Sequence, residues 1–261
     1  MLTSLERAMA CLASIVITAG CSSEMAEPTR PATTTSVIAE SPIQFTVQWV
    51  DNGVLDLMSP EATFLRAFVE SEQRSILTHG HGMGAIEAGG FPGFARAFNN
   101  VIDPDRVGGA AADGRPRLGT VVYEVIDIRR DGDRYHVVYC DYESLTAVKV
   151  GAQYSGLGSE PFASANQLTF GPDPALTPEQ QRAPSKDQKG PARVPVDNVF
   201  GTWVATPGSE YMDEATAREW YPKCRKWAPG TPADWPRDDK PRPTPPPTLP
   251  PSPGWPPGSS A

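Results

Sequence analysis

Apolar and polar residues alternate without exception along Ile43–Trp49, which predicts a strand with one buried face. The spacing then becomes helical after Ser59-Pro60-Glu61, where an N-cap, a first-turn proline and a first-turn acid come together. We expect this helix to run towards Leu77. Its buried stripe consists of Phe64, Leu65, Phe68, Val69 and Ile76.

The segment from residue 119 to residue 143 has the strongest β pattern in the chain. Two runs rich in β-branched and aromatic residues flank Asp131-Gly132, a dipeptide typical of a tight hairpin. A two-residue turn there predicts three opposed pairs on one face: Tyr123 with Cys140, Val125 with Val138, and Asp127 with His136. Cys140 is therefore expected to point into a packed layer.

The remaining patterns complete an α+β domain. They predict a helix from Pro92 to about Ile102, strands around Gln167–Phe170 and Val194–Thr206, and a helix from about Asp213 to Trp220. Residues 171–193 are polar, carry five prolines and predict a long surface excursion. Helices before a meandering sheet predict helices packed on one face of a curved antiparallel sheet.

Both ends of the chain lack the apolar residues that a core requires. Residues 22–41 are small and polar, and residues 228–261 are dominated by proline. We expect a disordered tether at 21–41, a single domain at 42–227 and a disordered proline-rich tail at 228–261. The tail has three readings: a polyproline docking strand, a spacer through cell-wall polymer, or passive disorder.

The N-terminus resembles the leader of a bacterial lipoprotein. The apolar run from Ala8 to Ala19 is shorter than the roughly 20 residues that span a bilayer, and Thr18-Ala-Gly-Cys21 follows it. The resemblance implies a signal peptide at 1–20, diacylglycerol on the Cys21 thiol and a further acyl chain such as palmitate. Thr18 stands where the motif usually has an aliphatic residue. A plain secretory signal and a buried N-terminal helix are the alternatives.

The lipoprotein interpretation has consequences for the cellular location and for cysteine pairing. It implies export and anchoring on the outer face of the cytoplasmic membrane by lipid alone. It also assigns Cys11 and Cys21 to the leader region, so the folded part keeps Cys140 and Cys224. Two cysteines in an oxidising compartment predict a disulfide.

The whole organisation resembles that of the uncharacterised lipoproteins of actinobacteria, of mycobacterial type. The order of elements in the domain resembles nuclear-transport-factor-like or cystatin-like folds. These resemblances imply a location and a fold but transfer no catalytic residue, because such folds serve both enzymes and binding domains.

The net charge of the chain excludes some classes of binding partner. A net charge of −8 and a pI near 5.0 argue against nucleic acid and against electrostatic membrane binding. The expected partners are the membrane, through the N-terminal lipid, and an envelope protein or cell-wall polymer.

Candidate chemistry is sparse. His79 and His81, with Glu87, are the right residue types for a metal, but no ligand motif such as H-E-x-x-H completes them, so we expect a flexible loop and neither metal nor cofactor. Asp127 and His136 form an acid–base pair if they are opposed, although such pairs also occur as ordinary sheet contacts.

Two further signals bear on activity. No G-x-S-x-G nucleophile motif occurs in the chain. Aromatic residues near the end of the domain predict either core or a ligand groove: Trp203, Tyr211, Trp220, Tyr221 and Trp227.

The leading hypothesis is a non-enzymatic, lipid-anchored envelope protein that binds a protein partner or a small apolar ligand. The alternative is an envelope enzyme, hydrolase or isomerase-like, with a cone-shaped cavity. Its candidate catalytic residues are His79, His81, Asp127 and His136.

Overall fold

A computed structural model describes residues 41, 43–109, 115–156, 163–238 and 240–258. The predicted signal peptide, Cys21 and the tether up to residue 40 lie outside these residues. No helix in the described part of the chain is long and apolar enough to cross a membrane. The elements are β1 (Ile43–Trp49), α1 (Pro60–Ile76), α2 (Gly82–Gly89), α3 (Phe94–Phe98), η1 (Pro104–Arg106), β2 (Arg117–Asp131), β3 (Arg134–Tyr142), β4 (Thr146–Val150), β5 (Gln153–Gly156), β6 (Ala163–Pro172), η2 (Pro178–Gln180), β7 (Trp203–Ala205) and α4 (Glu214–Cys224).

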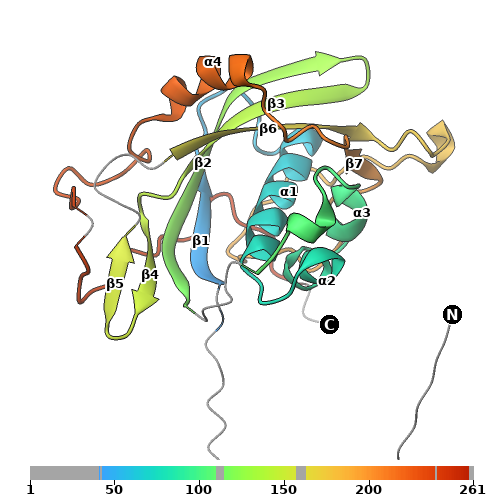
Figure 1. Ribbon diagram of the computed structural model, residues 1–261. Helices are drawn as coiled ribbons and strands as arrows, with labels where there is room; N and C mark the ends of the chain where they lie inside the picture. The colour runs from blue at the N-terminus through green and yellow to red at the C-terminus, as the bar shows by residue number, and fades with distance from the viewer. Residues whose placement is uncertain (1–40, 42, 110–114, 157–162, 239, 259–261) are drawn as a thin grey trace, which may run out of the picture. The chain divides into compact units, whose positions relative to one another are not determined.

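Seven strands form one sheet that curls into a half-barrel (Figure 1). The antiparallel path runs β5-β4-β2-β3-β6-β7, while β1 pairs in parallel with the first half of β2. The α+β fold class predicted from the sequence is confirmed. The strand expected over Val194–Thr206 is shorter than predicted and contains only Trp203–Ala205.

Helices α1, α2 and α3 pack on the concave face of the sheet and form the main core. Helix α1 begins as predicted, because the Ser59 side chain accepts a hydrogen bond from the Ala62 amide at 3.2 Å. Its apolar stripe packs against strands β2, β3, β6 and β7. The concave face therefore holds the larger share of the buried apolar side chains.

The glycine-rich string after α1 forms helix α2, where the sequence favoured a flexible loop. Glycine is required there by packing: a Cβ added at Gly89 would lie 2.5 Å from the Cα of Ser75 in α1. Helix α3 is shorter than the predicted helix over Pro92–Ile102. It stops because Asn99 and Asn100 take left-handed conformations, with φ of 45° and 54°.

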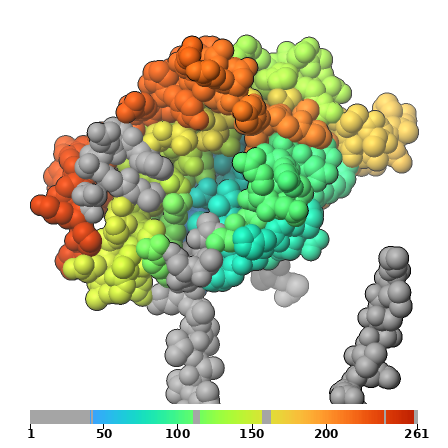
Figure 2. All heavy atoms as spheres, viewed as in Figure 1, coloured from blue at the N-terminus to red at the C-terminus, as the bar shows by residue number. Residues whose placement is uncertain are grey.

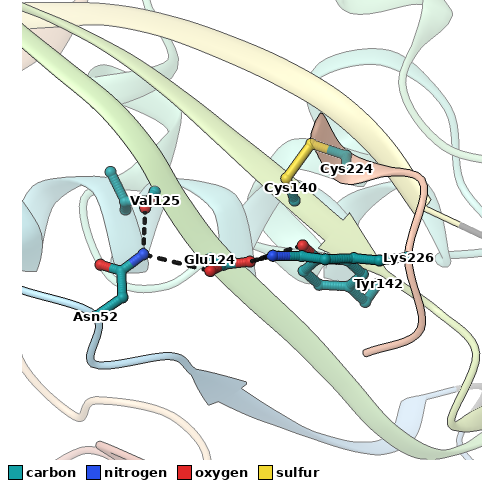
Figure 3. The surroundings of a disulfide bond; sticks show 7 residues. All are labelled: Asn52, Glu124, Val125, Cys140, Tyr142, Cys224 and Lys226. Carbon is teal, nitrogen blue, oxygen red and sulfur yellow. Dashed lines mark hydrogen bonds and ion pairs between the residues drawn. A yellow bond between two sulfur atoms is a disulfide. The ribbon is translucent and has the colours of Figure 1, made fainter. Parts of the chain in front are cut away.

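Helix α4 covers the convex face, opposite the other helices. Trp220 packs there against Val122 and Val138 in a second core cluster. The predicted disulfide between Cys140 and Cys224 is present, with a Cα–Cα distance of 5.4 Å, and both cysteines are buried (Figure 3). It joins the end of α4 to the middle of β3.

The hairpin between β2 and β3 has a different register from the predicted one. Asp131 pairs with Arg134, so the turn residues are Gly132, with φ of 58°, and Asp133. An irregularity between Val125 and Asp127 then shifts the pairing back by one residue. The observed pairs are Tyr123 with Asp141, Glu124 with Cys140, Val125 with Tyr139, Asp127 with Val138 and Arg129 with His136.

The proline-rich end is packed against the domain, which corrects the prediction of a disordered tail after Trp227. Its residues 246–258, called here the C-terminal segment, extend the edge of the sheet beside β1, where the Trp49 amide donates to the Ser252 carbonyl at 2.7 Å. Trp255 is only 1% exposed, and its indole N–H donates to Glu70 at 2.7 Å.

A buried arginine helps to hold this proline-rich segment against the domain. Arg66 donates to the carbonyl oxygens of Pro253 and Gly254 at 2.9 and 3.1 Å. Its guanidinium also lies 4.5 Å from the Trp255 ring centroid. Proline lacks an amide donor, so its segment has fewer backbone donors to satisfy, and donors from the domain satisfy several of its acceptors.

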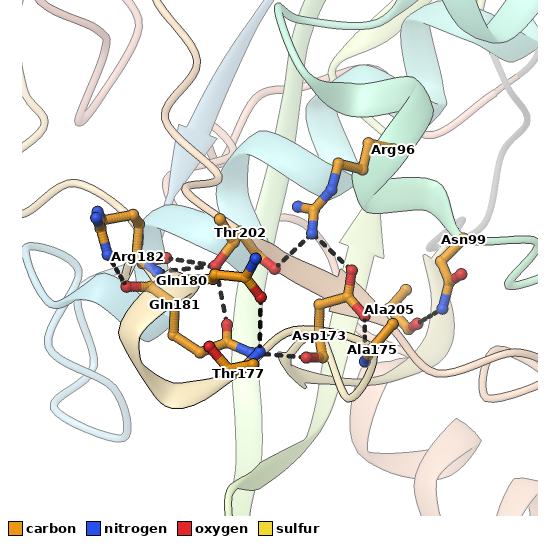
Figure 4. A network of polar contacts seen from close by, with 10 residues as sticks. All are labelled: Arg96, Asn99, Asp173, Ala175, Thr177, Gln180, Gln181, Arg182, Thr202 and Ala205. Atoms are coloured by element: carbon orange, nitrogen blue, oxygen red, sulfur yellow. Dashed lines mark hydrogen bonds and ion pairs between the residues drawn. The ribbon is translucent and has the colours of Figure 1, made fainter.

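The long loop after β6 is a surface excursion, as predicted, and polar contacts hold it to α3 and β7 (Figure 4). Arg96 of α3 forms an ion pair with Asp173 at 2.6 Å. Thr202 donates to the side chain of Gln181 at 2.9 Å, and Gln181 donates to the Asp173 carbonyl at 2.6 Å. These contacts fix the start of the loop near the end of α3.

Candidate functional site

None of the four predicted catalytic candidates lines the pocket that lies between α1 and the concave face of the sheet. His79 and His81 are exposed at the start of α2, where His81 occupies the N-cap position. Asp127 accepts from Arg129 at 2.8 Å, and Nδ1 of His136 lies 2.9 Å from the Thr169 hydroxyl. The predicted opposition of Asp127 and His136 is wrong, because Arg129 faces His136 across the hairpin.

No group of three His, Cys, Asp or Glu side chains within the described ranges is arranged to hold a metal ion. Glu87, the third residue considered with the two histidines, is exposed on α2.

A pocket of about 330 Å³ lies where α1 faces the concave side of β2, β3 and β6. The loop between β7 and α4 contributes the remaining wall. In Figure 2 this face is hollowed between the helices and the strands, and atoms of α1, in cyan, are visible in the hollow. The volume is at the lower end of the range found for small-molecule sites. We call it the acidic pocket, for the carboxyl groups of Glu72, Asp141 and Glu210.

Helix α1 contributes one wall through residues spaced along a single face. Val69, Glu72, Gln73 and Ile76 stand at positions i, i+3, i+4 and i+7, so their side chains share the face that looks onto the sheet. Glu72 continues the apolar stripe recognised in the sequence. A carboxyl on an otherwise apolar stripe was the signal that sequence reasoning missed.

The strands contribute the opposite wall. Tyr123 of β2, Asp141 of β3 and Ser164 of β6 are directly paired neighbours, so their side chains project from the same face of the sheet. Tyr139 and Asn166 form the adjacent row. The register decides this wall, because the predicted pairing would have turned Cys140 to the face of Tyr123 and Asp141 to the opposite face.

Glu210 comes from the loop before α4 and is held on both sides. Gln167 of β6 donates to the carbonyls of Ser209 and Tyr211, at 3.0 and 2.8 Å. The Ser209 hydroxyl also accepts from the Thr169 amide at 3.1 Å. A loop residue carries no periodic signal, so the sequence pattern did not indicate Glu210.

The carboxyl groups of Glu72 and Glu210 hydrogen-bond to each other. Burial, then the charge and hydrogen bond of Glu210, then the charge of Asp141, raise the pKa of Glu72 well above its usual range. Burial raises the pKa of Glu210 and outweighs the opposing effect of its hydrogen bond to Glu72. Two carboxyl groups in this contact favour a state in which one of them keeps its proton, since both cannot ionise cheaply side by side.

The pKa values of the neighbouring ionisable side chains are raised as well. Burial, followed by the charge of Glu143, raises the pKa of Asp141 well above its usual range, although Arg117 opposes the rise. Burial and the surrounding carboxylates also raise the pKa of Tyr123 and Tyr139. Both phenols therefore stay protonated and remain hydrogen-bond donors.

Polar atoms at the pocket wall lack partners. The Tyr123 hydroxyl, Asp141 Oδ1 and Glu210 Oε1 are buried and make no hydrogen bond within the described structure. Tyr123 as a whole is only 1% exposed, yet its side chain borders the pocket. Buried polar groups in proteins are almost always paired, so three unpaired atoms around one cavity leave hydrogen-bonding capacity unused there.

The cationic side chain that acts on Asp141 is already engaged in an ion pair. Arg117, whose charge reaches Asp141, forms an ion pair with Glu143, which also accepts from Gln73 at 3.3 Å. No lysine, arginine or histidine of the described residues lines the pocket. The acidic groups of the pocket are therefore not balanced by a cation at its wall.

The aromatic residues near the end of the domain do not form one groove. Trp203 and Trp220 are buried, but in two different core clusters on opposite faces of the sheet. Tyr211 and Tyr221 are exposed, Tyr211 by 80%. Tyr211 directly follows Glu210 in the chain.

No protein-family model matches this chain, and comparisons with curated proteins and with solved structures find no significant match.

Proposed function

We propose that this chain is a lipid-anchored protein of the cell envelope whose α+β domain binds a small ligand in the acidic pocket. One observation carries the binding function: Glu72, Asp141, Glu210, Tyr123 and Tyr139 converge on a cavity of about 330 Å³, with three of their polar atoms unpaired. The sequence favoured an apolar ligand or a protein partner. The polar wall favours a polar small molecule.

Energetics support a ligand over a purely structural role. A buried polar group without a partner destabilises a protein by about 1–3 kcal/mol. A cluster that served stability alone would pair its members, as the Glu124 cluster on the convex face does with Tyr142 and Lys226. The acidic pocket keeps unpaired groups around a space that a molecule can enter, which is the arrangement of a binding site.

The proposed cellular location is supported by two features of the chain. Thr18-Ala-Gly-Cys21 resembles a lipobox, and the Cys140–Cys224 disulfide is typical of an oxidising compartment outside the cytoplasm. We expect Cys21→Ala to release the protein from the membrane fraction. Cys11→Ala is the matched control, because that cysteine lies inside the proposed leader. Membrane retention of Cys21→Ala would refute lipid anchoring.

The binding function is tested by native mass spectrometry of the full chain purified from membranes. We expect a small molecule to copurify with the wild type, and Glu72→Gln with Glu210→Gln to lose it. Glu87→Gln, on the exposed side of α2, is the control and should retain it. If the pocket variants retain the same molecule, the ligand binds elsewhere and the proposal fails.

An acid–base enzyme is the second candidate function, favoured by the proton shared between Glu72 and Glu210 at the cavity wall. Paired carboxyl groups with raised pKa values are typical of general acid–base sites. The recovered ligand, incubated with the protein in deuterated water, separates the two functions. Deuterium in its carbon skeleton, or turnover lost in Glu210→Gln, would indicate an enzyme. An unchanged ligand favours binding.

A further inference from the structure

We propose that the acidic pocket is selective for an organic ammonium ion, a small amine that carries an apolar group. This inference rests on the proposed binding function and deepens it by naming the class of ligand. It is carried by the geometry of three carboxyl groups, two tyrosine rings and an apolar rim around one cavity.

The charge balance of the walls selects a cation. Glu72, Asp141 and Glu210 approach the pocket from α1, β3 and the loop before α4, and no basic side chain among the described residues lines it. Asp141 Oδ1 and Glu210 Oε1 are buried acceptors without a donor. An ammonium group offers up to three N–H donors and a positive charge, which matches acceptors converging from several directions. A carboxylate or phosphate would find no cationic side chain at the wall to balance its charge.

The tyrosines suit the same ligand. The rings of Tyr123 and Tyr139 lie 6.1 Å apart between centroids and meet edge to face. Aromatic faces attract cations, and the attraction strengthens where water is excluded. The unpaired Tyr123 hydroxyl adds a donor, so a ligand with an acceptor next to its amine is favoured.

The rim indicates an apolar body on the ligand. Val69, Ile76 and Ile102 line the pocket together with the acids, and Ile76 is 36% exposed. A bare metal ion would leave these side chains uncovered, and no described cluster is arranged to coordinate one. A small amine with an alkyl or aromatic group covers both parts of the wall.

Three probes of the same shape test the charge preference: 2-phenylethylamine, 2-phenylethanol and phenylacetate. Binding to the full chain is measured by isothermal titration calorimetry near neutral pH. We expect the amine to bind on the order of tenfold more tightly than the alcohol, since hydrogen bonds to charged groups are about twice as strong as neutral ones. Phenylacetate should not bind measurably.

Variants link that preference to the named residues. Glu210→Gln and Glu72→Gln should each reduce the affinity for the amine while leaving that for the alcohol within about twofold, because the amide keeps the shape of the side chain and removes its charge. Glu87→Gln should change neither affinity. Equal weakening of amine and alcohol by the pocket variants would overturn the charge argument.

Proton release provides a second readout. A bound cation ionises the carboxyl pair, so its affinity should rise between pH 5 and pH 8 while the amine itself stays charged. Titrations in phosphate and in Tris should show a net release of protons that the Glu72→Gln, Glu210→Gln double variant loses. The titratable and charged groups around the site are Glu70, Glu72, Arg117, Tyr123, Tyr139, Asp141, Glu143 and Glu210.

The outcomes separate the two proposals. Tighter binding of the alcohol or of phenylacetate, abolished by the pocket variants, overturns the ammonium inference and leaves the binding function standing. If no probe binds and no molecule copurifies, both proposals fail. Selective amine binding without proton release would overturn the role of the shared proton, because the pair would then be ionised before the ligand arrives.

Discussion

Carboxyl groups on the two faces of the sheet differ in their hydrogen-bond partners and in the direction of their pKa shifts. On the convex face, Glu124 accepts from Tyr142 at 2.7 Å and Lys226 at 2.8 Å, with Asn52 at 3.4 Å (Figure 3). Burial acts to raise its pKa, but these partners outweigh burial and lower it. On the concave face, Glu72, Asp141 and Glu210 have raised pKa values, and Asp141 Oδ1 and Glu210 Oε1 are unpaired.

This difference separates a structural cluster from a site. A carboxylate whose partners are all within the chain stabilises the fold and has no free acceptor for a ligand. Carboxyl groups that face a cavity with raised pKa values reduce the stability of the empty protein. The convex cluster also surrounds the disulfide, so that face is built for rigidity, whereas the concave pocket retains unmet bonding capacity.

The largest expected effect comes from the C-terminal segment, whose Trp255 satisfies another concave carboxylate, Glu70. Trp255→Ala should lower the free energy of unfolding by about 3–5 kcal/mol, because it removes a fully buried indole. Trp255→Phe should lose less, about 1–3 kcal/mol, since it keeps most of the volume but removes the N–H donor. Urea denaturation measures both. A change below about 1 kcal/mol for the alanine variant would mean that the segment is not part of the core.

The second-largest loss of stability is expected from removal of the disulfide on the convex face. Replacing Cys140 and Cys224 by alanine together should cost about 2–5 kcal/mol, because the bridge closes a long loop across a separation of 84 residues. Calorimetry of the wild type with and without reductant is the independent comparison. Ligand binding should persist in the double variant below its unfolding temperature. Loss of binding in the folded variant would show that the two faces are coupled.

A smaller effect separates the paired carboxylate from the unpaired ones. Glu124→Ala should destabilise the domain by about 1–3 kcal/mol, because it leaves Tyr142 and Lys226 without their acceptor. Glu210→Gln should be neutral or slightly stabilising in the absence of ligand, because it relieves the pair with Glu72. Chemical denaturation of both variants provides the measurement. Equal destabilisation would contradict the distinction between the two faces.

The smallest effect is the pH dependence of the ligand-free protein. The pKa of Glu70 is raised by burial to about 7, and those of Glu72, Asp141 and Glu210 are also raised. Unfolded carboxyl groups ionise near pH 4, so the folded state holds more protons above that value and stability falls as the pH rises through the folded pKa values.

Unfolding temperatures at pH 5, 6, 7 and 8 give the measurement. The wild type should become less stable across this series, and the Glu72→Gln, Glu210→Gln double variant should show a shallower decline. Glu124, with its lowered pKa, contributes in the opposite sense, and its stabilisation is lost only as the pH falls through that pKa. A slope unchanged in the double variant would contradict the raised pKa values of the pair.

Local pattern in the sequence accounts for much of the fold. The strand Ile43–Trp49 and the helix after Ser59 are where alternation and helical spacing predicted them. The pairing of Cys140 with Cys224 follows from cysteine use alone once the leader is set aside. These features depend on contacts within a few residues or on the number of cysteines, so they can be predicted from the sequence alone.

Tertiary structure decided the pocket and the packing of the C-terminal segment. The register of the β2–β3 hairpin depends on an irregularity after Val125, and a shift of one residue turns Asp141 from one face to the other. Glu210 reaches Glu72 from a loop that Gln167 of β6 holds through the carbonyls of Ser209 and Tyr211. Trp255 packs because Arg66, far away in sequence, bonds to neighbouring carbonyls. Residue type and spacing determined several of the elements, whereas long-range pairing, absent from any local pattern, determined which side chains meet.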